Sequence, residues 1–413
     1  MQTLCALRSG HLAGISELAL SEDLTDFPME ILSLADSLEV LDLSNNRLTS
    51  LPDEIKQLTK LRILFASNNP FETLPESLGK CPNLEIVGFK ANKIKHVPEA
   101  SLPQKLRWLI LTDNQITALP QSLGERCLLQ KLMLAGNQLA ELPSNLSQLT
   151  SLELVRISAN KLTHCPEQLL GLPKLAWIAF SGNPFSQVQP HTYFVPQVAF
   201  SSIDVKNVLG QGASGVISKA TWREPQLELE QDIAVKVFKG ELTSDGYPED
   251  EMQACLRAGA HPNLVQPVAQ IKEDDCKALV MALIPKHFRN LGLPPSFESC
   301  TRDTFAKGES LSIAHISKIV EQMESVFAHL HSKQVCHGDL YAHNTLVDDD
   351  GNIIFGDFGA ASMYYMLNEK QQAQIIQIER RALGCFIEDL LSVCADEDKI
   401  SQQYTELANR VVK

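Results

Sequence analysis

Seven leucines divide the first 185 residues of this chain into units of nearly constant length. Their successive spacings are 23, 23, 22, 23, 23 and 23 residues, from Leu38 through Leu61, Leu84, Leu106, Leu129 and Leu152 to Leu175. A fixed period of this size indicates stacked coils, because one short coil cannot bury its own apolar edge. This half of the chain is therefore expected to fold as a solenoid.

Each unit repeats the pattern L-x-x-L-x-L-x-x-N-x-L-x-x-L-P with small variations. The pattern is identified as the leucine-rich repeat, which implies an α/β solenoid with one short strand per coil. Its asparagines, from Asn46 to Asn183, are predicted to satisfy backbone groups of neighbouring coils and to have no catalytic role. We expect residues 1–185 to hold an atypical first repeat that acts as a cap, followed by about seven or eight repeats in all.

Polar residues suited to phosphate chemistry occur in two blocks of the second half. The first block runs from His337 to Asn344 and contains Asp339; the second is Asp357-Phe358-Gly359. Phosphoryl transfer needs a base or orienting group for the attacking hydroxyl, and oxygen ligands for Mg²⁺ on the phosphates. Asp339 suits the first role, and Asn344 and Asp357 suit the second.

Residues upstream provide further groups for holding phosphates. Gly210, Gly212 and Gly215 lie in a glycine-rich stretch, which alone is weak evidence because glycine also marks ordinary turns. An alternating apolar strand follows and carries Lys236, whose ammonium can neutralise phosphate charge. A helical run then contains Glu251, the preferred partner for Lys236, with Glu249 as the second choice.

Together these blocks resemble a eukaryotic-type protein kinase domain over residues 203–395, with a His-Gly-Asp catalytic loop. The resemblance implies an α+β bilobal fold with a reduced C-terminal lobe over residues 203–413, after a linker at residues 186–202. It assigns catalytic roles to Asp339, Lys236 and Glu251, and metal binding to Asn344 and Asp357. The cofactors implied are ATP and Mg²⁺. The ATP-binding residues implied are Gly210, Gly212, Gly215, Ile217, Ala234, Lys236, Met281, Leu283 and Leu346.

Three positions depart from the kinase pattern. Gly338 replaces an arginine that in this family pairs with a phosphorylated activation segment, so we expect activity without such phosphorylation. Tyr341 occupies a place where serine/threonine kinases carry a lysine. Glu379 is expected at the start of a core helix that usually opens with aspartate.

The sequence favours an ATP-dependent protein kinase that phosphorylates serine or threonine. Two alternatives remain open. His-Gly-Asp also resembles the catalytic loop of small-molecule phosphotransferases such as aminoglycoside and choline kinases. A pseudokinase scaffold, which binds ATP without turnover, is the other.

The repeat strands predict an apolar concave surface. Its outward residues include Phe65, Trp108, Ile110, Met133 and Trp177. A row of exposed apolar side chains usually marks a partner site, so we expect a protein partner there. The alternatives are that the kinase domain covers this surface, or that a homodimer does.

The amino-acid composition bears on binding partners and on cellular location. The net charge of −14 and the lack of a basic run argue against nucleic acid. No apolar stretch has the length of a membrane span. The ten cysteines are scattered without a Cys-x-x-Cys pair, which predicts reduced thiols in a cytoplasmic protein.

Overall fold

The computed structural model describes residues 2–187, 195–212, 214–224, 230–239 and 242–411. The chain forms two compact units, which we call the repeat unit and the second unit. The repeat unit comprises Met1–Leu175 and Asn183–Phe185, and the second unit comprises Ala176–Gly182 and Ser186–Lys413. Residues 188–194 of the predicted linker lie outside the described residues.

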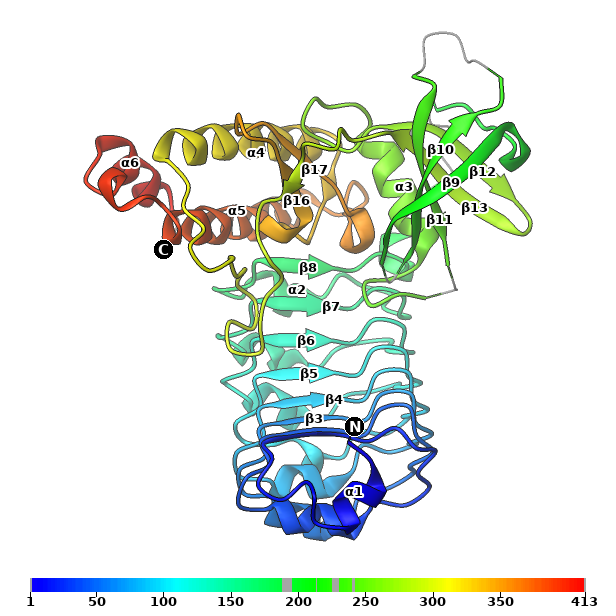
Figure 1. Cartoon of the computed structure of the whole chain (residues 1–413), viewed down its shortest axis with the longest axis vertical. Helices are drawn as coiled ribbons and strands as arrows, with labels where there is room; N and C mark the ends of the chain where they lie inside the picture. The colour runs from blue at the N-terminus through cyan, green and yellow to red at the C-terminus, as the bar shows by residue number, and fades with distance from the viewer. Residues whose placement is uncertain (1, 188–194, 213, 225–229, 240–241, 412–413) are drawn as a thin grey trace. The chain divides into compact units, whose positions relative to one another are not determined.

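Short parallel strands form one face of the repeat unit, and each strand pairs in register with the next (Figure 1). They are β1 (Glu17–Ala19), β2 (Val40–Asp42), β3 (Ile63–Phe65), β4 (Ile86–Gly88), β5 (Trp108–Ile110), β6 (Lys131–Met133) and β7 (Leu154–Arg156). The central leucine or valine of β2 through β7 is fully buried. The predicted solenoid of short strands is therefore confirmed.

Helical turns connect the strands. They are α1 (Leu4–Arg8), η1 (Met29–Leu34), η2 (Asp53–Gln57), η3 (Glu76–Lys80), η4 (Glu99–Ser101), η5 (Gln121–Glu125), η6 (Ser144–Gln148) and α2 (Glu167–Leu170). From η1 to α2 each turn follows a proline, which cannot donate a backbone hydrogen bond and so suits a helix start.

The repeated asparagines bond to the backbone of adjacent coils, as predicted. Asn69 Nδ2 donates to the carbonyl oxygen of Leu43 at 3.0 Å, and its Oδ1 accepts from the amide of Leu48 at 2.9 Å. Asn114 and Asn137 repeat this arrangement two and three coils further along. These amides satisfy buried backbone groups that would otherwise lack partners.

The first lobe of the second unit is a five-stranded sheet with one helix. The sheet has the order β12-β13-β11-β10-β9, and every adjacent pair is antiparallel. The elements are β9 (Ile203–Gln211), β10 (Gly215–Trp222), β11 (Asp232–Phe238), α3 (Pro248–Ala258), β12 (Pro267–Glu273) and β13 (Cys276–Ala282). Val235 and Val280 are fully buried within the core of this sheet.

The other lobe is mainly helical. Its helices are α4 (Ile313–Ser332), α5 (Glu369–Ser392) and α6 (Gln402–Arg410). Short strands lie among them: β14 (Arg289–Asn290), β15 (Val335–Cys336), β16 (Thr345–Val347), β17 (Ile353–Phe355) and β18 (Ser362–Met363). The two-lobed second unit confirms the predicted fold class. No helix in the described ranges has both the length and the apolar character needed to cross a bilayer.

The second unit also contains β8 (Trp177–Ala179), so its contacts extend further toward the N-terminus than the boundary expected at residue 185. Trp177 is only 1% exposed, and its ring stacks on Tyr341 with 4.9 Å between centroids. The prediction that Trp177 belongs to an open partner surface is therefore wrong, because another part of its own unit covers the ring. Phe65, Trp108, Ile110 and Met133 remain half-buried.

Candidate functional site

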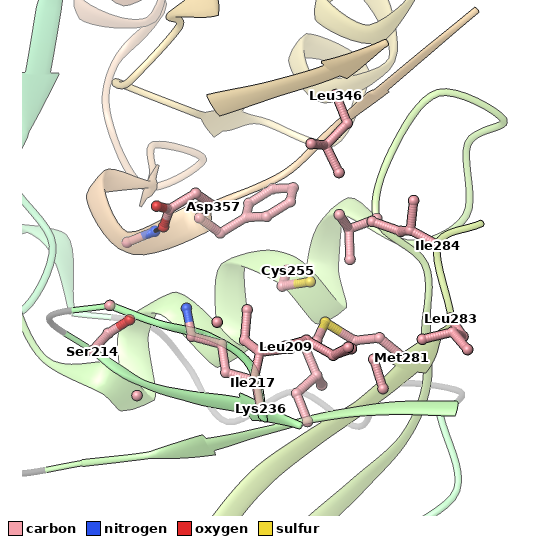
Figure 2. Close-up of a pocket in the computed structure, with 18 of the residues that line it drawn as sticks. Leu209, Ser214, Ile217, Lys236, Cys255, Met281, Leu283, Ile284, Leu346 and Asp357 are labelled. Carbon is pink, nitrogen blue, oxygen red and sulfur yellow. Dashed lines mark hydrogen bonds between the residues drawn. The ribbon is translucent and has the colours of Figure 1, made fainter. Parts of the chain in front are cut away.

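A cavity of about 1040 Å³ lies in the second unit. Its lining includes every residue that the sequence assigned to ATP binding, namely Gly210, Gly212, Gly215, Ile217, Ala234, Lys236, Met281, Leu283 and Leu346. Figure 2 shows Ile217 and Met281 on one wall, with Leu346 on the facing wall. Concave, mostly apolar sites with a few convergent polar groups are typical of small-ligand binding. The apolar walls suit a flat heteroaromatic ring such as a purine.

The three glycines differ in what they require. A Cβ atom at Gly215 would lie 2.4 Å from the Val237 carbonyl oxygen, so only glycine fits between β10 and β11. Gly210 and Gly212 have nothing within 4 Å of such an atom. The close approach of β11 therefore requires glycine at position 215. Gly210 and Gly212 instead leave their backbone accessible to an occupant of the cavity.

Lys236 and Glu251 form an ion pair in the wall of the cavity, as the sequence predicted. Lys236 lies on β11 between Ile217 of β10 and Leu279 of β13, and its amine donates to Glu251 on α3. The side chains are 11% and 6% exposed. Burial raises the pKa of Glu251 above its ordinary value; Lys236 opposes this shift and the Asp357 carboxylate adds to it. The second oxygen of Glu251, Oε2, is buried without a hydrogen-bond partner in the described part of the chain.

Asp339 and Asn344 meet in the loop between β15 and β16. Asn344 Nδ2 donates to Asp339 Oδ2 at 2.7 Å and to the Asp339 carbonyl oxygen at 3.2 Å. The short helix η9 (Ala342–Asn344) places the two side chains together despite the four residues between them. Because the amide nitrogen is engaged, the Asn344 oxygen is the atom left to bind a cation. Neither residue lines the cavity itself.

Asp357 projects into the cavity from the side opposite Lys236 (Figure 2). Its backbone is left-handed, with φ of 58° and ψ of 76°, and its side chain accepts from the Gly359 amide at 3.3 Å. The neighbouring Phe358 is 3% exposed, and the centroid of its ring lies 5.0 Å from that of the His337 ring. Phe358 thus anchors the turn, which leaves the Asp357 carboxylate exposed to an occupant.

The donor set fits Mg²⁺. Asp357 and Asn344 offer a carboxylate and an amide oxygen, which are hard ligands of the type Mg²⁺ takes together with phosphate oxygens. Among the described residues, no group of three or more His, Cys, Asp or Glu side chains forms a cage of its own. Mg²⁺ usually keeps few protein ligands and takes the rest from water or phosphate oxygens, an arrangement that two such oxygens would suit.

Glu379 supports the loop that carries Asp339. Its Oε1 accepts from the His337 amide at 2.7 Å, and its Oε2 lies 2.9 Å from His331 Nε2. Glu379 is 1% exposed and lies inside α5, which begins at Glu369. The expectation that Glu379 opens this helix is wrong, because Asn368 and Gln371 form a capping box that starts the helix ten residues earlier.

Asp303 and His343 were missed by the sequence analysis. Asp303 comes from the irregular stretch before α4, and its Oδ1 lies 2.7 Å from His343 Nδ1. Asp303 also accepts from the Ala342 amide. The pair therefore fixes the loop segment just before Asn344. No motif links residues 40 positions apart, so only the fold reveals this contact.

Family models match two separate parts of the chain. Residues 203–396 match the model of protein tyrosine and serine/threonine kinases, and residues 36–78 match the model of leucine-rich repeats in two copies. The chain carries leucine-rich repeats and a protein kinase domain. The predicted combination of these two domains is thereby confirmed, and a kinase domain implies the use of ATP, usually with a divalent metal.

Three relatives are similar to part of this chain. A serine/threonine-protein kinase of Debaryomyces hansenii is 24% identical over 43% of this chain and 29% of its own length. PrkC of Bacillus subtilis, a serine/threonine-protein kinase, is 27% identical over 32% of this chain and 19% of its own length. The angiopoietin-1 receptor of Danio rerio is 26% identical over 42% of this chain and 16% of its own length. The chain thus spans less than a third of each of these relatives.

Proposed function

We propose that this protein transfers the γ-phosphoryl group of Mg·ATP to a hydroxyl group of a protein, with serine or threonine as the acceptor. The observation that carries the proposal is that the Lys236–Glu251 pair and Asp357 line one cavity, while Asn344 holds the Asp339 carboxylate in the loop between β15 and β16. The names of two relatives, both serine/threonine-protein kinases, support the choice of hydroxyl.

Each side chain has a separate task in this reaction. Lys236, kept in place by Glu251, neutralises the α- and β-phosphates. Asn344 and Asp357 would supply oxygen ligands for Mg²⁺, and the bound ion would spread the charge of the phosphates. Asp339 orients the attacking hydroxyl and accepts its proton as the oxygen–phosphorus bond forms and ADP leaves.

We further propose that the repeat unit captures a protein partner or substrate through Phe65, Trp108, Ile110 and Met133. Phe65 lies against Gly88, where a Cβ atom would be 2.5 Å from its ring, and Ile110 is the next neighbour. The ammonium of Lys131 lies 4.3 Å from the centre of the Trp108 ring. Large half-buried aromatic residues of this kind are typical anchors in protein interfaces.

We infer a cytoplasmic location from the cysteines. All ten carry free thiols, and burial raises the pKa of Cys81 to about 11 and that of Cys255 to about 12. Such thiols are poor nucleophiles, and the absence of paired cysteines is typical of a reducing compartment.

The test is phosphate transfer from labelled ATP to three acceptors in parallel: a generic basic protein, an aminoglycoside and choline. Transfer to protein with a requirement for Mg²⁺ supports the proposal. Transfer to a small molecule alone would contradict it. One structural feature favours transfer to a small molecule. Only eleven residues separate Asp357 from α5, and so short a segment leaves little surface for binding a peptide.

A further inference from the structure

Residues 176–182, which we call the bracing segment, lie against the loop that carries Asp339. The Trp177 ring stacks on Tyr341 with an angle of 5° between the ring planes. Its Nε1 donates to the Leu340 carbonyl oxygen at 3.0 Å. Leu340 and Tyr341 directly follow Asp339, and both are almost fully buried. One side chain of the bracing segment therefore fixes the loop immediately after the proposed base.

The other end of the bracing segment fixes the start of the same loop. The amides of Phe180 and Ser181 both donate to Ser362 Oγ, at 2.9 and 3.1 Å. Ser362 is fully buried on β18, where it pairs with Cys336 of β15. Cys336 directly precedes His337, so these two bonds support the strand that leads into the loop.

Gly338 shows that the loop is built around the bracing segment. Its φ is +71°, in the region that favours glycine. A Cβ atom there would lie 2.3 Å from the Ile178 carbonyl oxygen and 3.0 Å from that of Ala360. A side chain at position 338 would clash with the bracing segment. The contact between the loop and the bracing segment therefore requires the glycine of His-Gly-Asp.

We propose that the bracing segment is a positioning element of the catalytic centre, with Trp177 as its main positioning residue. The functional kinase then begins at Ala176, before the family match that starts at Ile203. Catalytic groups need supporting contacts that hold them near the productive geometry, and a small displacement lowers the rate far more than it lowers substrate binding. The effect on turnover rests on the proposed kinase function, whereas the bracing of the loop does not.

The experiment uses the full chain with Trp177→Phe, Trp177→Ala and Ser362→Ala. Trp177→Phe keeps an aromatic ring on Tyr341 but loses the bond to Leu340. Leu128→Ala, which changes an exposed residue of the repeat unit that has no proposed role, is the control. We measure kcat and KM for ATP, and amide hydrogen exchange of the peptide covering residues 335–345.

The expected result is graded. Trp177→Phe lowers kcat by about tenfold and Trp177→Ala lowers it further, while KM for ATP stays within about twofold. Exchange in residues 335–345 becomes faster in both variants and in Ser362→Ala, and is unchanged in Leu128→Ala.

Three outcomes would overturn the proposal. The first is wild-type exchange and kcat in all three variants. The second is a raised KM with unchanged kcat. The third is faster exchange spread evenly over the whole second unit, which marks a merely structural role. If the intact chain transfers no phosphate, the proposed function fails, and selective exchange in residues 335–345 still decides whether the segment braces the loop.

Discussion

Removal of the Glu379 carboxylate is expected to destabilise the second unit and to slow phosphate transfer. Glu379 is 1% exposed and accepts from the His337 amide at 2.7 Å, with His331 Nε2 at 2.9 Å from its other oxygen. Glu379→Ala removes the carboxylate that bonds the buried His337 amide and the half-buried His331 ring. At about 1–3 kcal/mol for each of the two unsatisfied groups, the free energy of unfolding should fall by about 2–6 kcal/mol.

Glu379→Gln separates the hydrogen bonds from the charge. The glutamine oxygen still accepts from the His337 amide, and the glutamine nitrogen can donate to His331 Nε2 when the imidazole is neutral. We therefore expect a loss of only about 1 kcal/mol, within the usual range for one altered hydrogen bond. Turnover should fall less in Glu379→Gln than in Glu379→Ala, because the loop keeps its anchor.

Urea unfolding followed by tryptophan fluorescence measures these losses. In a Trp108→Phe background the two remaining tryptophans, Trp177 and Trp222, both belong to the second unit and report only on it. Glu321→Gln removes an exposed carboxylate from α4, and this matched control should change stability by less than about 0.5 kcal/mol. Equal, small losses in Glu379→Ala and Glu379→Gln would refute the anchoring role.

Three further predictions concern other residues. Lys236→Met should lower kcat/KM by about 100-fold or more, because phosphate charge loses its cation; wild-type turnover in a steady-state assay would contradict this. Burial, then Glu249, raises the pKa of Asp250 from 3.8 to about 6, while Ser181 opposes the shift. The folded state therefore holds that proton more tightly, so the stability it adds is complete below pH 3.8 and is lost as pH rises through about 6. Asp250→Asn should abolish this loss and stabilise the protein by about 1–2 kcal/mol at neutral pH, as urea midpoints across pH will reveal. The double change Phe65→Ala and Trp108→Ala should abolish capture of a protein partner in a pull-down and leave ATP turnover intact; capture that persists would exclude this surface.

The repeats could be predicted from the sequence because every coil uses the same pattern of buried leucines and a bonded asparagine. The spacing of Leu38 to Leu175 fixed the strands, and the asparagine at each bend implied its backbone bonds. The cavity could be predicted for a related reason. Its lining residues lie in short contiguous blocks of the sequence. Asp339 and Asn344, which do not line it, also lie in one block, so their pairing needed no knowledge of the fold.

The features that could not be predicted from the sequence depend on contacts between segments far apart in the chain. Trp177 fits the repeat pattern perfectly, yet its ring stacks on Tyr341, 164 positions later in the chain. The Asp303 contact with His343 likewise joins an irregular stretch to the loop that carries Asp339. The start of α5 was misplaced because the pattern around Glu379 suggested a helix opening, whereas the capping box at Asn368 determines it.

Phosphate transfer by the intact chain and by Asp339→Asn tests the central claim most directly. The intact chain is incubated with labelled ATP, Mg²⁺ and a basic protein, and any product is hydrolysed for phospho-amino-acid analysis. The account predicts labelled phosphoserine or phosphothreonine with the intact chain and almost none with Asp339→Asn. Equal labelling by both proteins, or ATP binding without any labelling, would contradict it and favour a scaffold that binds the nucleotide without turnover.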